Sequence, residues 1–210
     1  MSQLIYIFDP MCGWCYGFSP VIKALAEQHR DAHEFVILSG GMATGERAAP
    51  IGEAYGYIKG ALPVVTERTG VPFGEAFQRD ILEPGTYLYQ SEPPCIALTL
   101  FRSQRPQQAI AFAHDLQTAF FYHGQSLNAD ETYRQLASQH GLDGDAFIAE
   151  MKQPEWRERT HAEWQQVAQM GVQGFPTVVL AQGGQGYLLA HGYVDLSTLQ
   201  DRLAQLKAQV

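Results

Sequence analysis

Near its start the chain reads LIYIFDPMCGWCYGF at residues 4–18, a segment that holds two of its three cysteines, Cys12 and Cys15. The β-branched and aromatic run at residues 4–8 predicts a buried strand, which the turn Asp9-Pro10 would end. A helical pattern follows the turn directly. The two cysteines, spaced as CxxC, therefore stand where a strand passes into a helix.

The residues after the cysteines complete a strand–helix–strand unit. Residues 13–29 have one broad apolar face, which predicts a helix that Pro20 would kink. Residues 34–41 are mostly apolar and close on two glycines, which predicts a second buried strand. A βαβ connection of this kind places its two strands parallel in one sheet.

The middle of the chain, residues 42–170, shows no convincing strand pattern and several helical ones. Residues 107–122 repeat apolar side chains on one face, which predicts a helix. Asn128 with Glu131 predicts a capping box for a further helix that ends before Gly141. We therefore expect an all-helical subdomain here.

The C-terminal part returns to a strand pattern. Residues 177–181 and 187–191 predict two strands that form a hairpin across a flexible five-residue turn. Asp195 or Ser197 would cap a final helix. The C-terminal part of the chain therefore has the predicted order ββα.

The order βαβ, helical block, ββα predicts an α/β protein with a large all-helical insertion. Residues 1–41 and 171–210 would form the α/β domain, and residues 42–170 would form the inserted subdomain. The chain has no internal repeat and no low-complexity linker. The helices are therefore expected inside the domain rather than appended to it.

Composition limits the classes of function. The 210 residues are 46% hydrophobic and 17% charged, which is typical of a packed globular protein. Fourteen Lys and Arg against 22 Asp and Glu give a net charge of −8, which argues against nucleic-acid or anionic-membrane partners. No segment approaches the roughly 18 consecutive apolar residues of a membrane helix, and the first residues lack the basic region of a secretory signal. We expect a cytoplasmic protein.

The CxxC motif carries the chemistry. At the first turn of a helix, Cys12 would meet unpaired backbone N–H groups and the positive end of the helix dipole, which both favour a thiolate. Cys15 lies one turn later, close enough to form a disulfide with Cys12 and turned toward the sheet. This geometry predicts attack by an accessible Cys12 and resolution of the mixed disulfide by a covered Cys15. Gly13 would allow a substrate to approach closely, and Trp14 would flank its sulfur.

A metal site and a purely structural role are less favoured for the cysteine pair. A structural zinc site would need two more ligands, but the sequence has no second CxxC, so we expect no metal. Two inert buried thiols are the structural alternative. A CxxC that directly follows a buried strand and opens a helix in a βαβ unit favours redox chemistry.

Several features together resemble the thioredoxin fold: the strand before the CxxC helix, Pro20 eight residues after Cys12, and Pro176 before the C-terminal hairpin and helix. Because a helical block separates Cys12 from Pro176, the chain most resembles the DsbA family, whose thioredoxin domain carries such an insertion. Three segments look like those of signal-less, DsbA-like proteins related to FrnE: residues 8–18, Ser91-Glu92-Pro93-Pro94-Cys95, and Gly171-Val172-Gln173-Gly174-Phe175-Pro176-Thr177.

The resemblance implies a thiol–disulfide oxidoreductase or isomerase that acts on protein or peptide disulfides. It implies that Cys12 is the nucleophile and Cys15 the resolving thiol. Pro176 would be a cis-proline in contact with Cys12, and Phe175 would pair its backbone with the bound peptide. No cofactor is expected beyond the redox-active disulfide, with glutathione or a thioredoxin-type reductant as a partner. The Gly13-Trp14 dipeptide lacks the histidine of the strongly oxidising DsbA type, so that oxidising power is not implied.

Two alternatives belong to other classes of function. Phe8-Asp9, Trp14 and Tyr16 are also similar to kappa-class glutathione transferases and 2-hydroxychromene-2-carboxylate isomerases, which act on small molecules with bound glutathione. Those proteins carry a serine at the position of Cys12. Because this chain has both sulfurs, disulfide exchange is favoured here. The third hypothesis is a binding module or a redox-controlled chaperone. It would be favoured if the thiols were inactive in disulfide exchange.

Asp9 and Cys95 are expected to have structural roles. Asp9 would accept a proton from Cys15 or cap the turn, and its turn preference favours the cap. Cys95 follows a plausible helix N-cap at Ser91 and is expected to be a small buried hydrophobe.

Two aromatic and two imidazole side chains in the second half of the chain are also expected to be structural. Trp156 and Trp164 would pack the core of the insertion rather than line a substrate groove. His161 and His191 have no partner that the sequence reveals, so each is expected to be hydrogen-bonded within the fold.

Overall fold

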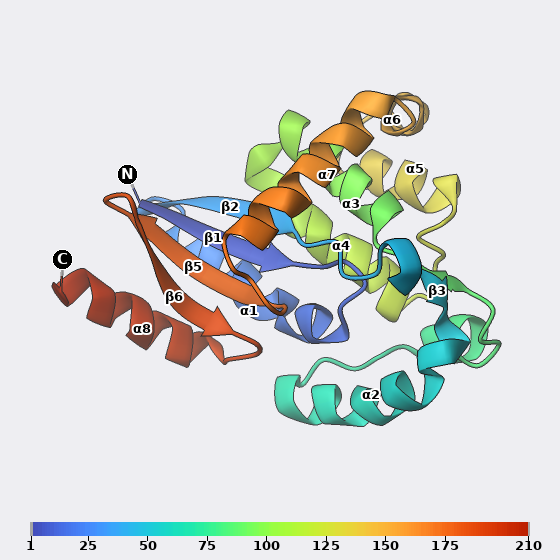
Figure 1. Cartoon of the computed structure of the whole chain (residues 1–210), viewed down its shortest axis with the longest axis horizontal. Coiled ribbons are helices and arrows are strands. Elements are labelled where there is room, and N and C mark those ends of the chain that lie inside the picture. The colour runs from blue at the N-terminus through green and yellow to red at the C-terminus, as the bar shows by residue number, and fades with distance from the viewer. Residues whose placement is uncertain (1, 210) are drawn as a thin grey trace.

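The computed structural model describes residues 2–209, with side chains described to residue 206. Its centre is a four-stranded sheet in the order β2-β1-β5-β6 (Figure 1). Strands β1 and β2 are parallel, as the βαβ pattern predicts, and the other neighbouring pairs are antiparallel. The strands are β1 (Ser2–Phe8), β2 (His33–Ser39), β5 (Thr177–Gln182) and β6 (Gln185–His191).

Helices cover both faces of the sheet, with α7 on one side and α8 on the other in Figure 1. Side chains alternate along β1: Tyr6 and Phe8 belong to the main core, whereas Ile7 packs with Val167 of α7. The helices nearest the sheet are α1 (Gly13–His29), α7 (Pro154–Gln169) and α8 (Leu196–Gln209). The fold class, α/β of the thioredoxin type with a helical insertion, is confirmed.

The middle of the chain is a block of helices, as expected. Helix α4 packs against α1 and thereby joins this block to the sheet. The exact boundaries of the two domains stay a prediction. The helices are α2 (Tyr55–Thr69), α3 (Glu92–Gln104), α4 (Ala109–Phe121), α5 (Asp130–Gln139) and α6 (Gly144–Met151), with short segments η1 (Gly45–Arg47), η2 (Ile51–Ala54), η3 (Phe77–Leu82) and η4 (Pro106–Gln108).

Two expectations for the insertion are wrong. Strands β3 (Ala49–Pro50) and β4 (Leu88–Tyr89) pair as a small antiparallel sheet, and strands of two residues are too short to leave an alternating pattern in the sequence. The expected capping box does not form, because α5 begins after Ala129 and the Asn128 side chain donates to the Leu88 carbonyl at 2.8 Å instead.

The C-terminal hairpin is tighter than expected. Both strands extend further, and the turn shrinks to Gly183 and Gly184, whose φ angles of 61° and 79° suit a two-residue hairpin loop. Asp195 caps α8, since its carboxylate accepts the Thr198 N–H at 2.7 Å, and the Ser197 hydroxyl donates to that carboxylate. Within residues 2–209, no helix combines the length and apolar character needed to cross a membrane.

Candidate active site

Cys12 stands at the junction between the sheet and helix α1. It is the N-cap residue of α1, and its sulfur accepts the Cys15 backbone N–H at 3.3 Å. Its thiol also points at the Phe175 carbonyl oxygen, 3.8 Å away. Only 6% of the Cys12 surface is exposed, so the thiol that was expected to be accessible belongs to a largely buried residue.

Cys15 is completely covered, as helix geometry predicts. Burial raises the pKa of its thiol well above the ordinary value, and hydrogen bonding and charge at Cys12 add to that rise. Both cysteines are free thiols in this structure. The structure therefore leaves a small part of Cys12 exposed and keeps the Cys15 thiol protonated in the core.

Asp9 anchors the turn that carries the cysteines. Its carboxylate accepts the Met11 N–H at 2.9 Å, the Met42 N–H at 2.7 Å and the Ser91 hydroxyl at 2.8 Å. Burial raises the pKa of Asp9, while these hydrogen bonds and the charge of Arg47 oppose the rise. The cap interpretation is confirmed, and a role as proton acceptor stays a prediction.

Two further anchors of this turn come from the insertion and left no signal in the sequence. The Gln117 amide on α4 donates to the carbonyl oxygens of Asp9 and Cys12, at 3.3 and 3.5 Å. The Tyr89 hydroxyl on β4 donates to the Met11 carbonyl. Because these residues lie far from the CxxC in sequence, only the tertiary fold brings them to it.

A cavity of about 360 Å³ opens beside Cys12. The peptide bond between Phe175 and Pro176 is cis, as expected, and Phe175 forms part of the cavity wall. The lining comes from the cysteine turn, the loop after β2, η1, α7 and the loop before β5: Cys12, Gly40, Gly41, Met42, Arg47, Trp164, Val167, Ala168, Val172, Gln173, Gly174 and Phe175.

Gly13 and Trp14 do not line this cavity. A Cβ atom at Gly13 would lie 3.5 Å from the Phe73 ring, so an aromatic residue of the insertion faces this glycine. Trp14 is half-buried and packs against the main core. A contact between either residue and a substrate remains a prediction.

The two tryptophans of α7 differ in role, contrary to expectation. Trp156 is buried in the core, as predicted. Trp164, however, lines the Cys12 cavity, and its indole N–H donates to the Ser39 hydroxyl at 3.2 Å. Both residues lie on one helix, and only the position of Gly41 under the second half of α7 makes the second ring a cavity wall.

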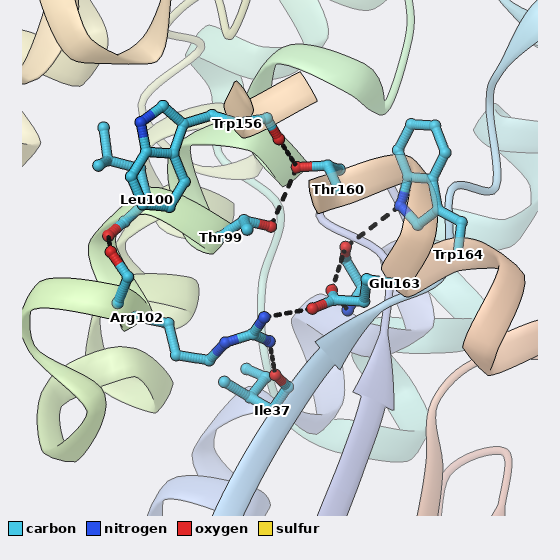
Figure 2. A network of polar contacts seen from close by, with 10 residues as sticks. Ile37, Thr99, Leu100, Arg102, Trp156, Thr160, Glu163 and Trp164 are labelled. Atoms are coloured by element: carbon cyan, nitrogen blue, oxygen red, sulfur yellow. Dashed lines mark hydrogen bonds and ion pairs between the residues drawn. The ribbon is translucent and has the colours of Figure 1, made fainter. Parts of the chain in front are cut away.

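A polar network holds that wall in place (Figure 2). Glu163 is buried and accepts both the Ser39 N–H, at 2.7 Å, and the Ser39 hydroxyl, at 2.8 Å. Arg102 pairs with the same carboxylate and donates to the Ile37 carbonyl. The network therefore fixes the end of β2, directly before the two glycines that line the Cys12 cavity.

The third cysteine and the histidines have structural surroundings. Cys95 is fully buried, and burial raises the pKa of its thiol well above the ordinary value. Ser91 is the N-cap residue of α3, as expected, but its hydroxyl donates to Asp9 and accepts no backbone N–H of the helix. His161 pairs with a Glu92 oxygen at 2.6 Å, and His191 lies 3.3 Å from the Thr177 hydroxyl. In the described part of the chain, no three His, Cys, Asp or Glu residues form a group that could hold a metal ion.

A sheet of this topology, with a CxxC at the start of α1 and a proline loop against the first cysteine, defines a protein of the thioredoxin-fold class. Residues 3–204 match the family model described as the DSBA-like thioredoxin domain. The chain belongs to this family, which confirms the resemblance noted in the sequence.

Several solved structures cover nearly the whole chain. A candidate protein disulfide isomerase from Nitrosomonas europaea is 30% identical, with a TM-score of 0.87 over 99% of this chain and 98% of that one. The cytosolic disulfide reductase DsbM from Pseudomonas aeruginosa is 26% identical, with a TM-score of 0.79 over the same shares, and it has also been solved with glutathione. A 2-hydroxychromene-2-carboxylate isomerase, 16% identical with a TM-score of 0.66, shares the fold alone.

A curated relative has another description. The ClpXP adapter protein SpxH of Shouchella clausii is 25% identical over 176 residues, which are 83% of this chain and 56% of SpxH. The chain thus spans just over half the length of this relative.

Proposed function

We propose that this protein is a thiol–disulfide oxidoreductase in which Cys12 attacks a disulfide substrate and Cys15 resolves the product. The observation that carries the proposal is the position of the Cys12 sulfur. It lies at the N-terminus of α1, accepts the Cys15 N–H at 3.3 Å and faces a cavity, while the second sulfur is fully covered. Hydrogen bonds donated to a sulfur at a helix N-terminus stabilise the thiolate that attacks.

The reaction requires two exchanges. The Cys12 thiolate attacks one sulfur of the substrate disulfide, the substrate S–S bond breaks, and its other sulfur leaves as a thiolate. Cys15 then loses its proton and attacks the Cys12 sulfur, which releases the second substrate thiolate and forms the Cys12–Cys15 disulfide. The substrate gains two electrons and the protein loses two. Two molecules of a thiol such as glutathione, or a dithiol protein, would return the pair to its reduced form.

The loop before β5 would hold the substrate. The Phe175 carbonyl lies beside the Cys12 sulfur, and Pro176 offers no N–H to the adjacent ladder. We expect an extended peptide to pair with the Phe175 backbone while its disulfide meets Cys12. Gly13 and Trp14 would contact the part of a larger substrate that lies outside the cavity.

Reduction is the direction that we propose, in the cytoplasm and with glutathione as electron donor. The support is the similarity to the Pseudomonas disulfide reductase, which is described as cytosolic and has been solved with glutathione. The Gly13-Trp14 dipeptide adds to it, since no histidine between the cysteines stabilises the reduced form.

The reduction potential of the Cys12–Cys15 pair tests this proposal. The protein is equilibrated in glutathione buffers of known ratio, and its thiols are trapped and counted by mass spectrometry. A value near about −270 mV supports a reductase, whereas one between about −120 and −180 mV would indicate an oxidase or isomerase. A pair that never equilibrates with glutathione contradicts the proposal.

Two other functions make different predictions. A glutathione-dependent transferase or isomerase of the 2-hydroxychromene-2-carboxylate isomerase type would keep its activity on a small molecule when Cys15 is replaced. A binding module, such as an adapter of the kind that SpxH is described to be, would bind its partner with Cys12 alkylated. Assaying Cys15→Ser on small molecules, and Cys12-alkylated protein for partner binding, separates these two functions from disulfide exchange.

A further inference from the structure

The cavity beside Cys12 contains one cation. Of the described residues that line it, Arg47 is the sole one with an arginine, lysine, aspartate or glutamate side chain. The whole chain has a net charge of −8, so the sign of this charge is opposite to that of the protein. The neighbouring Glu46 is exposed and is not part of the lining.

The position of Arg47 is fixed through Gly41. The guanidinium donates to the Gly41 carbonyl at 3.3 Å. Gly41 has a φ of +64°, and a Cβ atom there would lie 2.7 Å from the Trp164 ring, so the backbone passes directly under the indole. Arg47 is therefore tied to the cavity wall, while enough of its surface stays exposed to meet a ligand.

The Phe175 wall lies closer still to the backbone of the glycine pair. A Cβ atom at Gly40 would lie 1.9 Å from the Phe175 ring, so the two glycines run between Phe175 and Trp164. The Phe175 carbonyl is also the group that faces the Cys12 sulfur. One cavity therefore holds a reactive sulfur, two aromatic walls and one guanidinium.

The electrostatic effect of Arg47 reaches the site itself. Its charge acts on the buried Asp9 carboxylate beneath the cysteine turn. Apart from the Cys12 thiolate itself, no charged lining residue would oppose an anion that meets this cation. A guanidinium pairs well with a carboxylate, because its planar N–H groups match the two oxygens.

The size of the cavity limits the ligand. Its volume of about 360 Å³ is at the small end of the range for small-molecule sites, about 300 to 1,000 Å³. It accommodates a few residues of peptide or one small thiol compound. A protein substrate would place only the residues around its disulfide there.

We propose that Arg47 selects low-molecular-weight disulfides that bear a carboxylate near the sulfur. This proposal rests on the proposed function and adds its substrate class. Arg47 binds the carboxylate and so holds the disulfide against the Cys12 sulfur. It takes no part in the bond exchange, so it acts as a specificity residue.

Three matched disulfides test this selection: 3,3′-dithiodipropionate, which is a dianion, bis(2-hydroxyethyl) disulfide, which is neutral, and cystamine, which is a dication. The second-order rate at which each oxidises the reduced protein is measured for wild type, Arg47→Gln and Arg47→Lys. Arg105→Gln serves as the control, because it removes the same charge from an exposed site on the loop between α3 and η4. Comparing each variant with wild type on one disulfide cancels the disulfide's own reactivity.

We expect Arg47→Gln to lower the rate with the dianion about five- to tenfold. The rate with the neutral disulfide should stay within about twofold of wild type, and the rate with cystamine should be equal to wild type or higher. Arg47→Lys should restore part of the rate for the dianion. Added salt should reduce the difference between wild type and Arg47→Gln, since the contact is exposed. Arg105→Gln should match wild type on all three.

Two results would overturn the proposal. An equal loss on all three disulfides would mean that Arg47 acts through Asp9 or the fold, and no change on any of them would mean that it contacts no substrate. The proposed function fails separately, if the wild-type protein does not react even with the neutral disulfide. Thermal unfolding of each variant checks that the fold is retained.

Discussion

Cys12 and Cys15 lie one helical turn apart, yet their surroundings differ in almost every respect. Around Cys12 are a cavity, a backbone carbonyl and a cation. Around Cys15 are the core, the buried Tyr6 hydroxyl and the Asp9 turn. One side chain type therefore receives two roles from its surroundings: Cys12 can meet a substrate at the cavity, and the covered Cys15 thiol can meet only its neighbour.

Of the substitutions considered, removing either sulfur of the CxxC should change disulfide reduction most, and the two variants should differ from each other. Cys12→Ser should lower disulfide reduction by at least about a thousandfold, because the attacking sulfur is lost. In Cys15→Ser, Cys12 should still attack the substrate, but the mixed disulfide should accumulate. Mass spectrometry detects it as an adduct on Cys12. If both variants turn over, or if the adduct forms on another cysteine, the division of roles between the two sulfurs is wrong.

The two sides of the site also differed in how well the sequence revealed them. The strand–turn–helix pattern around Cys12 depends on local periodicity and turn chemistry, which neighbouring residues determine. The anchors that hold the same turn, Gln117 and Tyr89, come from the insertion. Long-range contacts of this kind leave no periodic signal, so a single sequence could not predict them.

Tertiary contacts also account for two side chains of the insertion whose partners the sequence did not reveal. Trp164 and Trp156 share one helical pattern, and only the position of α7 over Gly41 separates a cavity wall from a core residue. Ser91 is the N-cap residue of α3, but its hydroxyl donates to the Asp9 carboxylate, which is a tertiary partner. The fold class was therefore predictable, while one wall of the site was not.

The cavity side can be disturbed without touching a sulfur. Gly40→Ala would place a methyl group 1.9 Å from the Phe175 ring, so the ring must move. We expect disulfide exchange to slow about tenfold, because Phe175 carries the carbonyl beside Cys12. The free energy of unfolding should fall by about 1–3 kcal/mol from overpacking. Stopped-flow exchange and urea unfolding measure the two effects.

Gly60→Ala is the matched control for that substitution. Gly60 lies in α2, where an added Cβ would have no neighbour within 4 Å. Alanine is a better helix former than glycine, so this variant should gain about 0.5–1 kcal/mol and keep its exchange rate. Equal effects of the two alanines on the rate would mean that the contact between Gly40 and Phe175 does not shape the site.

The buried side can be tested through Tyr6. Its hydroxyl forms no regular hydrogen bond with any described residue, but burial and the nearby Cys15 and Cys12 hold the pKa of Tyr6 well above its ordinary value. The hydroxyl thus stays protonated and can donate to Cys15 when that sulfur becomes a thiolate. Tyr6→Phe should slow resolution about three- to fivefold at pH 7, the worth of one hydrogen bond.

The pH dependence separates this effect from a packing change. The pKa of Cys15 is already raised, so resolution should speed up as the pH rises and the thiolate forms. Losing a donor raises that pKa further, which should move the profile of Tyr6→Phe to higher pH. Resolution is followed by the release of a fluorescent thiol from the mixed disulfide. A slower rate with an unshifted profile would show that Tyr6 acts through packing only.

Cys95 gives the smallest expected effect and tests whether burial alone accounts for the role of Cys15. Both thiols are fully buried with raised pKa values, but Cys95 lies on α3 and forms no CxxC with another cysteine. Cys95→Ala should keep disulfide exchange within about twofold, with a stability loss of about 1 kcal/mol from the small cavity. Iodoacetamide at pH 7 should label one thiol of the native reduced protein, Cys12. Labelling of Cys95 in the native protein, or loss of exchange in Cys95→Ala, would mean that a third sulfur takes part. If neither occurs, Cys15 owes its role to its place one turn after Cys12, and burial serves only to direct it toward that partner.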